Sequence, residues 1–498
     1  MDRFSCKSVQ SRNWKNGLAA ALLMIAIVSL VVYISSFWTG ATFELSAIIS
    51  QHPAQEIIIP LNCSGKDQTQ TCPSNYPKNF QTKNRGIPSS QSTCPEYFRW
   101  IHEDLRPWKS TGISREMMER AHPTAHFRLI IVDGKAYIQQ FRKSYQTRDV
   151  YTIWGIVQLL RRYPGKLPDL ELMFDCDDSP VIRSSDHRGP KSRTPPPLFA
   201  YCGSESTVDI AFPDWSFWGW EEINIKPWDS LLREIKAGNN QTKWIDRVPY
   251  AYWKGNAFSG SKSRIDLLTC NVSDQMDWNA RIYNLDWSHE SSQGFKHSDL
   301  ASQCTHRYKI YIEGNAWSVS EKYILACDSM TLFVNSKYHD FFTRYLQPMK
   351  HYWPIREDNK CKSIKFAVDW GNFNRQKAQE IGKAASKFIQ EELKMDYIYD
   401  YMFHLLNEYA KLLKFKPKVP DGAVEVCSET MACRANGLQE KFMMETSVKG
   451  PSITNPCTMP PYDTKVLASF DRGKFDAMKQ VHNLEDKYWE SLNILRHN

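Results

Sequence analysis

Several signatures of common enzyme and metal-binding classes are missing from this sequence. It has no Cys-x-x-Cys pair, no Gly-x-Ser-x-Gly, no His-Glu-x-x-His and no EF-hand loop. These absences argue against a zinc ribbon, an α/β-hydrolase, a zinc protease and a calcium sensor. The 13 histidines form no cluster with ligand spacing. The net charge is +8, but basic and acidic residues are interspersed, so no nucleic-acid partner is expected.

Charged residues are also missing from Gly17 to Trp38. At about 1.5 Å per residue, a helix of this length crosses the ~30 Å hydrocarbon layer of a membrane. Arg3 and Arg12 precede the segment and Glu44 is the first charge after it, so residues 1–16 are expected in the cytosol. A cleaved signal peptide would have a shorter apolar core, of about 7–15 residues. The sequence therefore predicts a signal-anchor over 17–38, with the rest of a type II membrane protein in the lumen.

The cysteines agree with a lumenal body. Cys6 falls on the cytosolic side, which leaves twelve of the 13 cysteines in an oxidising compartment, where disulfides form. The chain ends LRHN rather than in an ER-retrieval tetrapeptide, so the Golgi is expected rather than the ER. Three N-glycosylation sequons follow the anchor, at Asn62, Asn240 and Asn271.

Composition divides the lumenal part into four segments. Residues 39–93 are polar and Pro-containing, as in a stem. Helical and strand patterns then alternate over 94–250 and 251–417, which predicts an α/β fold with parallel sheets in two Rossmann-like halves that face a cleft. Within the first half, Asp133-Gly134 predicts a hairpin with a type I′ turn. Residues 418–498 carry three cysteines and are expected to form a disulfide-tied extension.

Three carboxylates follow the apolar run LELMF, at Asp175, Asp177 and Asp178. In open α/β sheets ligands bind beyond the carboxyl ends of strands, so these groups are expected to face a cleft. Asp175-Cys-Asp177 matches the Asp-x-Asp pattern by which many glycosyltransferases hold Mn²⁺ against a nucleotide diphosphate. Alternatively, Asp178 serves as a general base for an acceptor hydroxyl. The third interpretation is a solvated turn before Pro180.

Two loops have the composition of an anion site. Lys254–Arg264, KGNAFSGSKSR, lies between a predicted strand and a helix start, where backbone N–H groups and the helix dipole favour phosphate. Ser261 interrupts the P-loop pattern, which weakens an NTPase interpretation. The segment from Gly314 to Ser320 repeats the strand–loop–helix arrangement. A plain flexible loop and an ordinary helix N-cap are the structural alternatives.

Aromatic residues make up 13% of the chain, with 17 tryptophans. Aromatic faces stack on sugars and bases, although a Trp-rich core is an equally good explanation. The stretch FPDWSFWGW, with Trp215, Phe217 and Trp218, is a candidate sugar or acceptor platform on the first view and a piece of core on the second.

Several of these stretches, in this order, resemble a known family. LPDLELMFDCDDSP, FPDWSFWGW, YWKGNAFSGSKSRIDL and HRYKIYIEGNAWSVSEKYILACDSMTLFV look like the Rumi-type protein O-glucosyltransferases, a family that includes fungal capsule-associated xylosyltransferases. The similarity runs from about Cys94 to Leu413. It implies a GT-B fold, a UDP-sugar donor and an inverting transfer to a hydroxyl of a protein or polysaccharide, with no metal and no other cofactor.

The resemblance also implies roles for single residues. Asp178, in the context Asp178-Ser-Pro, corresponds to the catalytic base, and Cys304 and Cys327 correspond to a disulfide pair. The residues implied to bind the UDP-sugar are Gly255, Asn256, Arg264, Gly314, Asn315, Ala316, Trp317, Ser318, Ser320 and Lys322.

The sequence departs from the family at three places. Asn256 stands where the family commonly has Ser, and Ser320 stands where it commonly has Arg, with Lys322 as the candidate to compensate. The segment after Trp220 lacks the features by which animal members grip an EGF-like domain, so another acceptor is expected. A metal-dependent GT-A-like transferase and a catalytically silent, anchored carbohydrate-binding protein remain the alternatives.

Overall fold

The computed structural model describes residues 58–63, 71–73, 92–189, 192–258, 260–296 and 299–497. The chain divides into two compact units, Met1–Gln55 and Glu56–Asn498, and all the described residues belong to the second. The predicted cytosolic tail and signal-anchor lie outside the described residues. Among the residues that are described, no helix has both the length and the apolar composition needed to span a membrane.

The first sheet has six strands in the order β13-β2-β1-β3-β4-β6. Its strands are β1 (Phe127–Val132), β2 (Lys135–Gln140), β3 (Leu170–Phe174), β4 (Phe199–Ala200), β6 (Ile210–Ala211) and β13 (Val424–Val426). Strand β1 pairs antiparallel with β2 and β3, whereas β3, β4 and β6 run parallel. The alternating pattern predicted a parallel arrangement, but the β1–β2 hairpin makes this sheet mixed.

The predicted hairpin is confirmed. Strands β1 and β2 pair in register from Phe127 with Gln140 to Val132 with Lys135. The two residues between them have positive φ, 52° at Asp133 and 71° at Gly134. A type I′ turn requires positive φ at both central positions, and Asp-Gly is a favoured sequence for it.

The second sheet has five parallel strands in the order β12-β10-β9-β7-β8. Its strands are β7 (Val248–Gly255), β8 (Ala280–Asn284), β9 (His306–Tyr311), β10 (Met330–Val334) and β12 (Trp353–Ile355). In chain order this is the doubly wound arrangement 2-1-3-4-5, whose direction reverses between β7 and β9. Ligands bind at such a switch point, beyond the carboxyl ends of the two strands.

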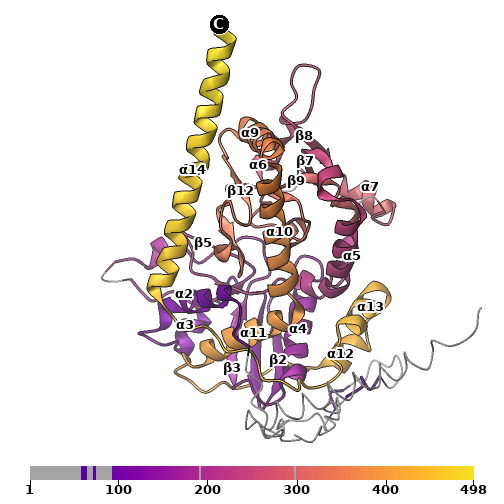
Figure 1. The fold of residues 1–498 in the computed structure, drawn as a ribbon. Helices are drawn as coiled ribbons and strands as arrows, with labels where there is room; N and C mark the ends of the chain where they lie inside the picture. The colour runs from indigo at the N-terminus through magenta and orange to yellow at the C-terminus, as the bar shows by residue number, and fades with distance from the viewer. Residues whose placement is uncertain are drawn as a thin grey trace, which may run out of the picture. The chain divides into compact units, whose positions relative to one another are not determined.

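Helices cover both sheets (Figure 1). They include α4 (Arg148–Arg162), α5 (Trp228–Gln241), α6 (Lys262–Leu268), α7 (Trp287–Ser292), α8 (Ser320–Leu325), α9 (Lys360–Phe373), α10 (Arg375–Glu392) and α11 (Met395–Ala410). Helix α10 packs on β10 of the second sheet, but α11 packs on β3 and α4 of the first. There the Tyr409 hydroxyl donates to the carbonyl of Glu171 at 3.1 Å. The segment 251–417, expected as one half, therefore returns to the first sheet at its end.

Three disulfides join the C-terminal extension to earlier parts of the chain, two of them to the described parts of the predicted stem and one to the first residue after it. Cys63 bonds to Cys433, Cys72 to Cys427 and Cys94 to Cys457. The extension also adds β13 to the edge of the first sheet and contains α12 (Ser428–Ala432), α13 (Gly437–Thr446) and the long α14 (Thr464–His497). Polar composition predicted a tether over 39–93, whereas residues 58–63 and 71–73 are held by covalent bonds that composition does not reveal.

Two further disulfides lie in the second sheet's half, Cys270–Cys361 and Cys304–Cys327. Ten described cysteines are thus paired, as expected for an oxidising compartment. Cys176 and Cys202 are buried free thiols, so the twelve cysteines assigned to the lumen are not all in disulfides.

Candidate functional site

Arg142 neutralises two of the three clustered aspartates after β3. Its guanidinium lies 3.0 Å from Oδ1 of the buried Asp175 and 3.1 Å from Oδ2 of the exposed Asp177. Asp175 Oδ1 also accepts a hydrogen bond from the Asp177 backbone N–H at 3.1 Å. Like charges are therefore tolerated here because a shared cation and backbone donors compensate them.

The same aspartates form a triad with His126 in which oxygen and nitrogen atoms lie close enough together for a metal ion. His126 Nδ1 is 2.9 Å from both Asp175 Oδ1 and the backbone nitrogen of Cys176. Because that N–H is a fixed donor, Nδ1 is an acceptor whose lone pair is in use. With Arg142 already on both carboxylates, this donor set fits an ion-pair network better than a cation site.

Asp178 has a cation of its own. Its half-exposed carboxylate accepts a hydrogen bond from Arg148 at 2.7 Å, and the same guanidinium nitrogen donates to the carbonyl of Cys176 at 3.2 Å. The buried Arg148 guanidinium lies 4.5 Å from the ring centre of Trp215 and 5.1 Å from that of Tyr145. These contacts and the two hydrogen bonds fix the guanidinium, which in turn fixes the carboxylate.

Sequence reasoning missed Arg148 and Tyr145. Arg148 is the first residue of α4, where the helix dipole disfavours a cation. A basic residue at that position was therefore a signal that a nearby anion compensates it. Tyr145 is 61% exposed, and its ring presents an aromatic surface to solvent beside the Arg148 guanidinium.

Arg264 connects the two predicted anion loops. Its guanidinium donates to the carbonyls of Asn256 (3.3 Å), Ile312 (3.3 Å) and Glu313 (3.0 Å), and to the hydroxyl of Ser318 (3.2 Å). The first carbonyl belongs to the loop after β7 and the other partners belong to the segment after β9. Arg264 therefore holds together the two loops that flank the switch point of the second sheet.

The two loops also meet backbone to backbone. Gly260 has φ +100°, and a Cβ at this position would lie 2.7 Å from backbone atoms of Asn315.

In the second loop Ala316 and Trp317 are buried while Asn315 is exposed. Ser318 receives support from Tyr311, whose hydroxyl accepts its backbone N–H at 3.2 Å. The hydroxyls of Ser318 and Ser320 lie 2.9 Å apart.

The first loop is ordered by asparagine side chains. Gly255 ends β7, and Asn256 Oδ1 accepts the backbone N–H of Phe258 at 2.8 Å. Asn284, at the end of β8, accepts the N–H of Ala257 at 2.9 Å. An asparagine thus supplies the turn after Gly255, where the resembling family commonly has serine.

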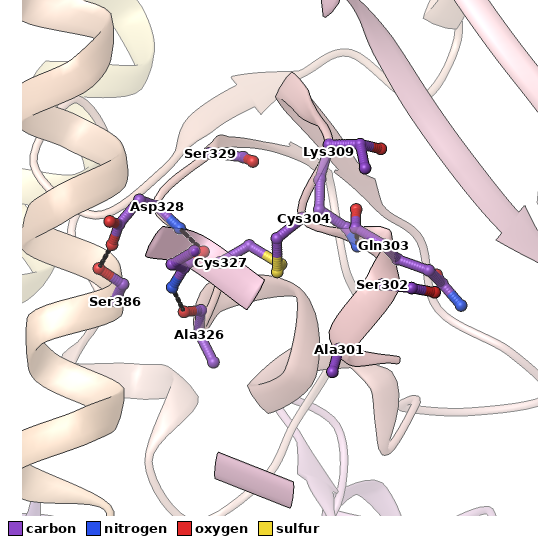
Figure 2. Close-up of a disulfide and its surroundings, with 12 residues drawn as sticks. Ala301, Ser302, Gln303, Cys304, Lys309, Ala326, Cys327, Asp328, Ser329 and Ser386 are labelled. Carbon is purple, nitrogen blue, oxygen red and sulfur yellow. Dashed lines mark hydrogen bonds between the residues drawn. A yellow bond between two sulfur atoms is a disulfide. The ribbon is translucent and has the colours of Figure 1, made fainter. Parts of the chain in front are cut away.

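The Cys304–Cys327 disulfide, which the resemblance implied, closes the unit that carries the second loop (Figure 2). It joins the residues before β9 to the end of α8. Next to it, Asn239 of α5 donates to the Ala326 carbonyl at 2.9 Å and accepts the Asp328 N–H at 3.0 Å. The disulfide therefore joins the two ends of the β9–loop–α8 unit, and Asn239 ties the α8 end to α5.

Asp178 faces these loops from the first sheet. Burial lowers the pKa of Arg264, and the negative charge of Asp178 is among the groups that oppose this effect. The Cys202 thiol donates to the Asp178 carbonyl at 3.2 Å. Trp317 of the second loop packs 5.7 Å from Tyr201 and 6.1 Å from Trp215, measured between ring centres. The structure thus brings Asp178 and both predicted loops to one place.

The predicted aromatic platform is wrong. Trp215, Phe217 and Trp218 are all at most 1% exposed and belong to the hydrophobic core. Trp218 also donates from its indole to the hydroxyl of Tyr399 at 3.0 Å. These rings have no exposed face on which a sugar could stack. The alternative interpretation, that this stretch belongs to the core, is confirmed.

Lys322 is likewise not available as a phosphate ligand. It is 2% exposed, and its ammonium donates to Asp214 at 2.8 Å. The ammonium also lies 4.7 Å from the ring centre of Phe217. A buried cation with a buried counterion cannot leave that partner cheaply, so Lys322 does not compensate for the serine at position 320.

The sequons differ in accessibility. Asn62 and Asn240 are exposed. Asn271 is half-buried, and its carboxamide donates to the Ile282 carbonyl at 3.1 Å and accepts the Ile282 N–H at 2.9 Å.

Asp209 supports the segment that follows Asp178. Its two carboxylate oxygens accept the backbone N–H groups of Val181 (3.0 Å) and Ile182 (2.9 Å). Burial raises the pKa of Asp209 to about 6, although these backbone donors act in the opposite direction.

A search of protein families matches residues 89–485 to the model described as glycosyl transferase family 90. The chain is 27% identical over 349 residues to the O-glucosyltransferase rumi homolog of Aedes aegypti, covering 68% of this chain and 84% of that protein. It is 27% identical over 343 residues to protein O-glucosyltransferase 1 of Homo sapiens, covering 66% and 83%. With O-glucosyltransferase rumi of Drosophila melanogaster the identity is 24% over 354 residues, covering 67% and 81%.

The raised pKa of Asp209 predicts a pH-dependent stability. The contribution of the Asp209 carboxyl group to the free energy of unfolding is fully present below about pH 4 and is lost as the pH rises through about 6. Relative to Asp209→Asn, the wild type should gain about 2 kcal/mol of unfolding free energy between pH 7 and pH 4. Urea unfolding at several pH values measures this, with Asp186→Asn as the exposed control. A difference that stays flat over this range would contradict the assignment.

Proposed function

Because this chain belongs to glycosyl transferase family 90, we propose that it transfers glucose or xylose from a UDP-sugar to a hydroxyl group of a protein or polysaccharide. It is a glycosyltransferase, and the finer assignment rests on one observation. Asp178 lies in the loop after β3 of the first sheet, and its negative charge acts on Arg264, which joins the two loops at the switch point of the second sheet. The relatives named protein O-glucosyltransferases favour glucose and a protein acceptor.

The two sheets supply the two sides of a GT-B-type site. The second sheet binds the nucleotide, because its order places a ligand crevice between β7 and β9. The backbone N–H groups of the two loops, with the hydroxyls of Ser318 and Ser320, surround the pyrophosphate. Arg264 fixes the loops relative to each other and adds positive charge beside the phosphates.

The chemistry is a single displacement. Asp178 takes the proton from the acceptor hydroxyl while that oxygen forms a bond to the anomeric carbon. The bond from this carbon to the UDP oxygen breaks, UDP leaves with the electron pair, and the configuration at the anomeric carbon inverts. Arg148 keeps the carboxylate in the orientation that the acceptor hydroxyl requires. The negative charge that develops on UDP is stabilised by the loop donors and Arg264.

This reaction has no role for a metal ion. In a GT-A-type mechanism the Asp-x-Asp carboxylates bind a divalent cation that holds the diphosphate. Here Asp175 and Asp177 are both in contact with Arg142, and Asp175 is buried. The charge that a metal would supply to UDP comes instead from Arg264 and from backbone dipoles.

The acceptor reaches Asp178 past Tyr145. The ring of this residue is exposed beside the Arg148 guanidinium, so it takes the place of the buried tryptophans as the aromatic contact for the acceptor.

The protein works in an oxidising compartment, as five disulfides indicate. We place it in the Golgi membrane, as a type II protein with its catalytic part in the lumen. The uncharged segment 17–38 and the cations before it support this location.

The base assignment predicts the effect of Asp178→Asn. The amide keeps the volume and an acceptor for Arg148 but cannot take a proton. Transfer should fall by a factor of about 10² to 10⁴ while the Kd for UDP stays within a few-fold of the wild type. Product formation by mass spectrometry and calorimetric titration with UDP measure the two quantities.

Asp177→Asn is the matched control, because Asp177 is an adjacent exposed carboxylate whose partner is Arg142. It should retain most of the activity. An Asp178→Asn enzyme that turns over like the wild type would sink the base assignment. An absence of transfer and of UDP-sugar hydrolysis in the wild type, with every donor tried, would favour a silent carbohydrate-binding protein.

The proposed mechanism also predicts resistance to chelation. Activity after dialysis against excess EDTA should equal that of the untreated enzyme, because no step uses a cation. A rate that collapses in EDTA and returns with Mn²⁺ would instead support the GT-A-type alternative at Asp175 and Asp177.

A further inference from the structure

The short segment from Phe199 to Ser204 crosses from one side of the site to the other. Its first residues form β4 in the first sheet. Its last residues form β5 (Gly203–Ser204), which pairs with β11 (Tyr338–His339) beyond the second sheet's β10. Cys202 lies between the two strands, where the chain leaves the side of the base and reaches the side of the donor loops.

Cys202 and its neighbour Tyr201 contact the two sides of the site. The Cys202 Sγ lies 3.2 Å from the backbone carbonyl of Asp178, to which the thiol donates. The ring of the preceding residue, Tyr201, packs against the ring of Trp317 in the second donor loop, with the ring centres 5.7 Å apart. The Cys202 side chain is 1% exposed, and burial raises the pKa of the thiol, so it remains protonated and able to donate.

We propose that Cys202 is a positioning residue that fixes the distance between the base and the donor loop. This inference rests on the proposed function, since it assigns Asp178 and Trp317 to the two sides of the reaction. The thiol acts through the backbone of Asp178, from a segment whose Tyr201 ring packs on Trp317, and it does not touch substrate. Displacing a reacting group by about 1 Å can cost a factor of 10² in rate, so a segment that holds both sides is of catalytic value.

Cys202 is one of two described cysteines that form no disulfide. Ten described cysteines are in disulfides, and Cys202 is free together with Cys176. The Cys176 thiol is also buried, and burial raises its pKa as it raises that of Cys202. Cys176 therefore provides a matched control, a second buried thiol in the same region without a bond to the base.

Two substitutions separate hydrogen bonding from space filling. Cys202→Ser keeps a donor and an acceptor, whereas Cys202→Val fills a similar volume and removes both. We expect kcat of Cys202→Val to fall about tenfold with KM for the UDP-sugar within twofold of the wild type. Cys202→Ser should restore kcat to within about threefold. Cys176→Val should keep the wild-type kcat, and thermal unfolding of all three variants checks that they are folded.

The opposite results are equally clear. Wild-type kcat in Cys202→Val would overturn the proposal, as would equal losses of kcat in Cys202→Val and Cys176→Val. So would a loss in Cys202→Val that Cys202→Ser shares in full. Asp178→Asn, assayed in parallel, keeps the two claims apart. If it is inactive while Cys202→Val is fully active, only the positioning role fails, and if it is active, the proposed function fails.

Discussion

The guanidinium of Arg264 is the contact on which the site depends. It is bonded to the loop after β7 and to the segment after β9, and these two loops flank the switch point of the parallel sheet. A buried guanidinium is costly unless its donors are used, and here carbonyls and a serine hydroxyl use them. Without this residue the two loops would lose the hydrogen bonds that hold them in a fixed position relative to each other, whatever ligand they bind.

The position of the first sheet depends on a second buried cation. Lys322, just after the second loop, pairs with Asp214, which follows β6 by three residues, and the Tyr323 hydroxyl donates to Ser216 at 2.9 Å. Removing one partner of such a pair leaves an uncompensated buried charge, which costs about 3–5 kcal/mol. These contacts hold the aromatic core segment 214–218 against α8, and so they determine how the acidic loop faces the nucleotide side. Lys322, which the sequence suggested as a phosphate ligand, thus stabilises the packing between these two segments.

Local sequence patterns predicted the parts of the site that follow from one stretch of chain. The hairpin at Asp133-Gly134, the strand that precedes Asp178, and the strand–loop–helix units around Arg264 and Ser318 each have a local cause, in turn chemistry or in apolar periodicity. The contacts between distant segments could not be predicted in this way. Arg148 meets Asp178 across 30 positions and Cys63 meets Cys433 across 370, and no local pattern reports such pairings. The tryptophans of FPDWSFWGW were ambiguous for the same reason, because burial depends on what packs over them.

In the proposed site, the pyrophosphate of a donor lies between two loops and opposite Asp178. A structure of the full chain determined with bound UDP tests this arrangement. We expect phosphate oxygens within hydrogen-bonding distance, about 3 Å, of donors in the segments 255–264 and 314–320, with the terminal phosphate turned towards Asp178. A pyrophosphate bound away from both loops, or with Asp178 on the far side of the uridine, would contradict it.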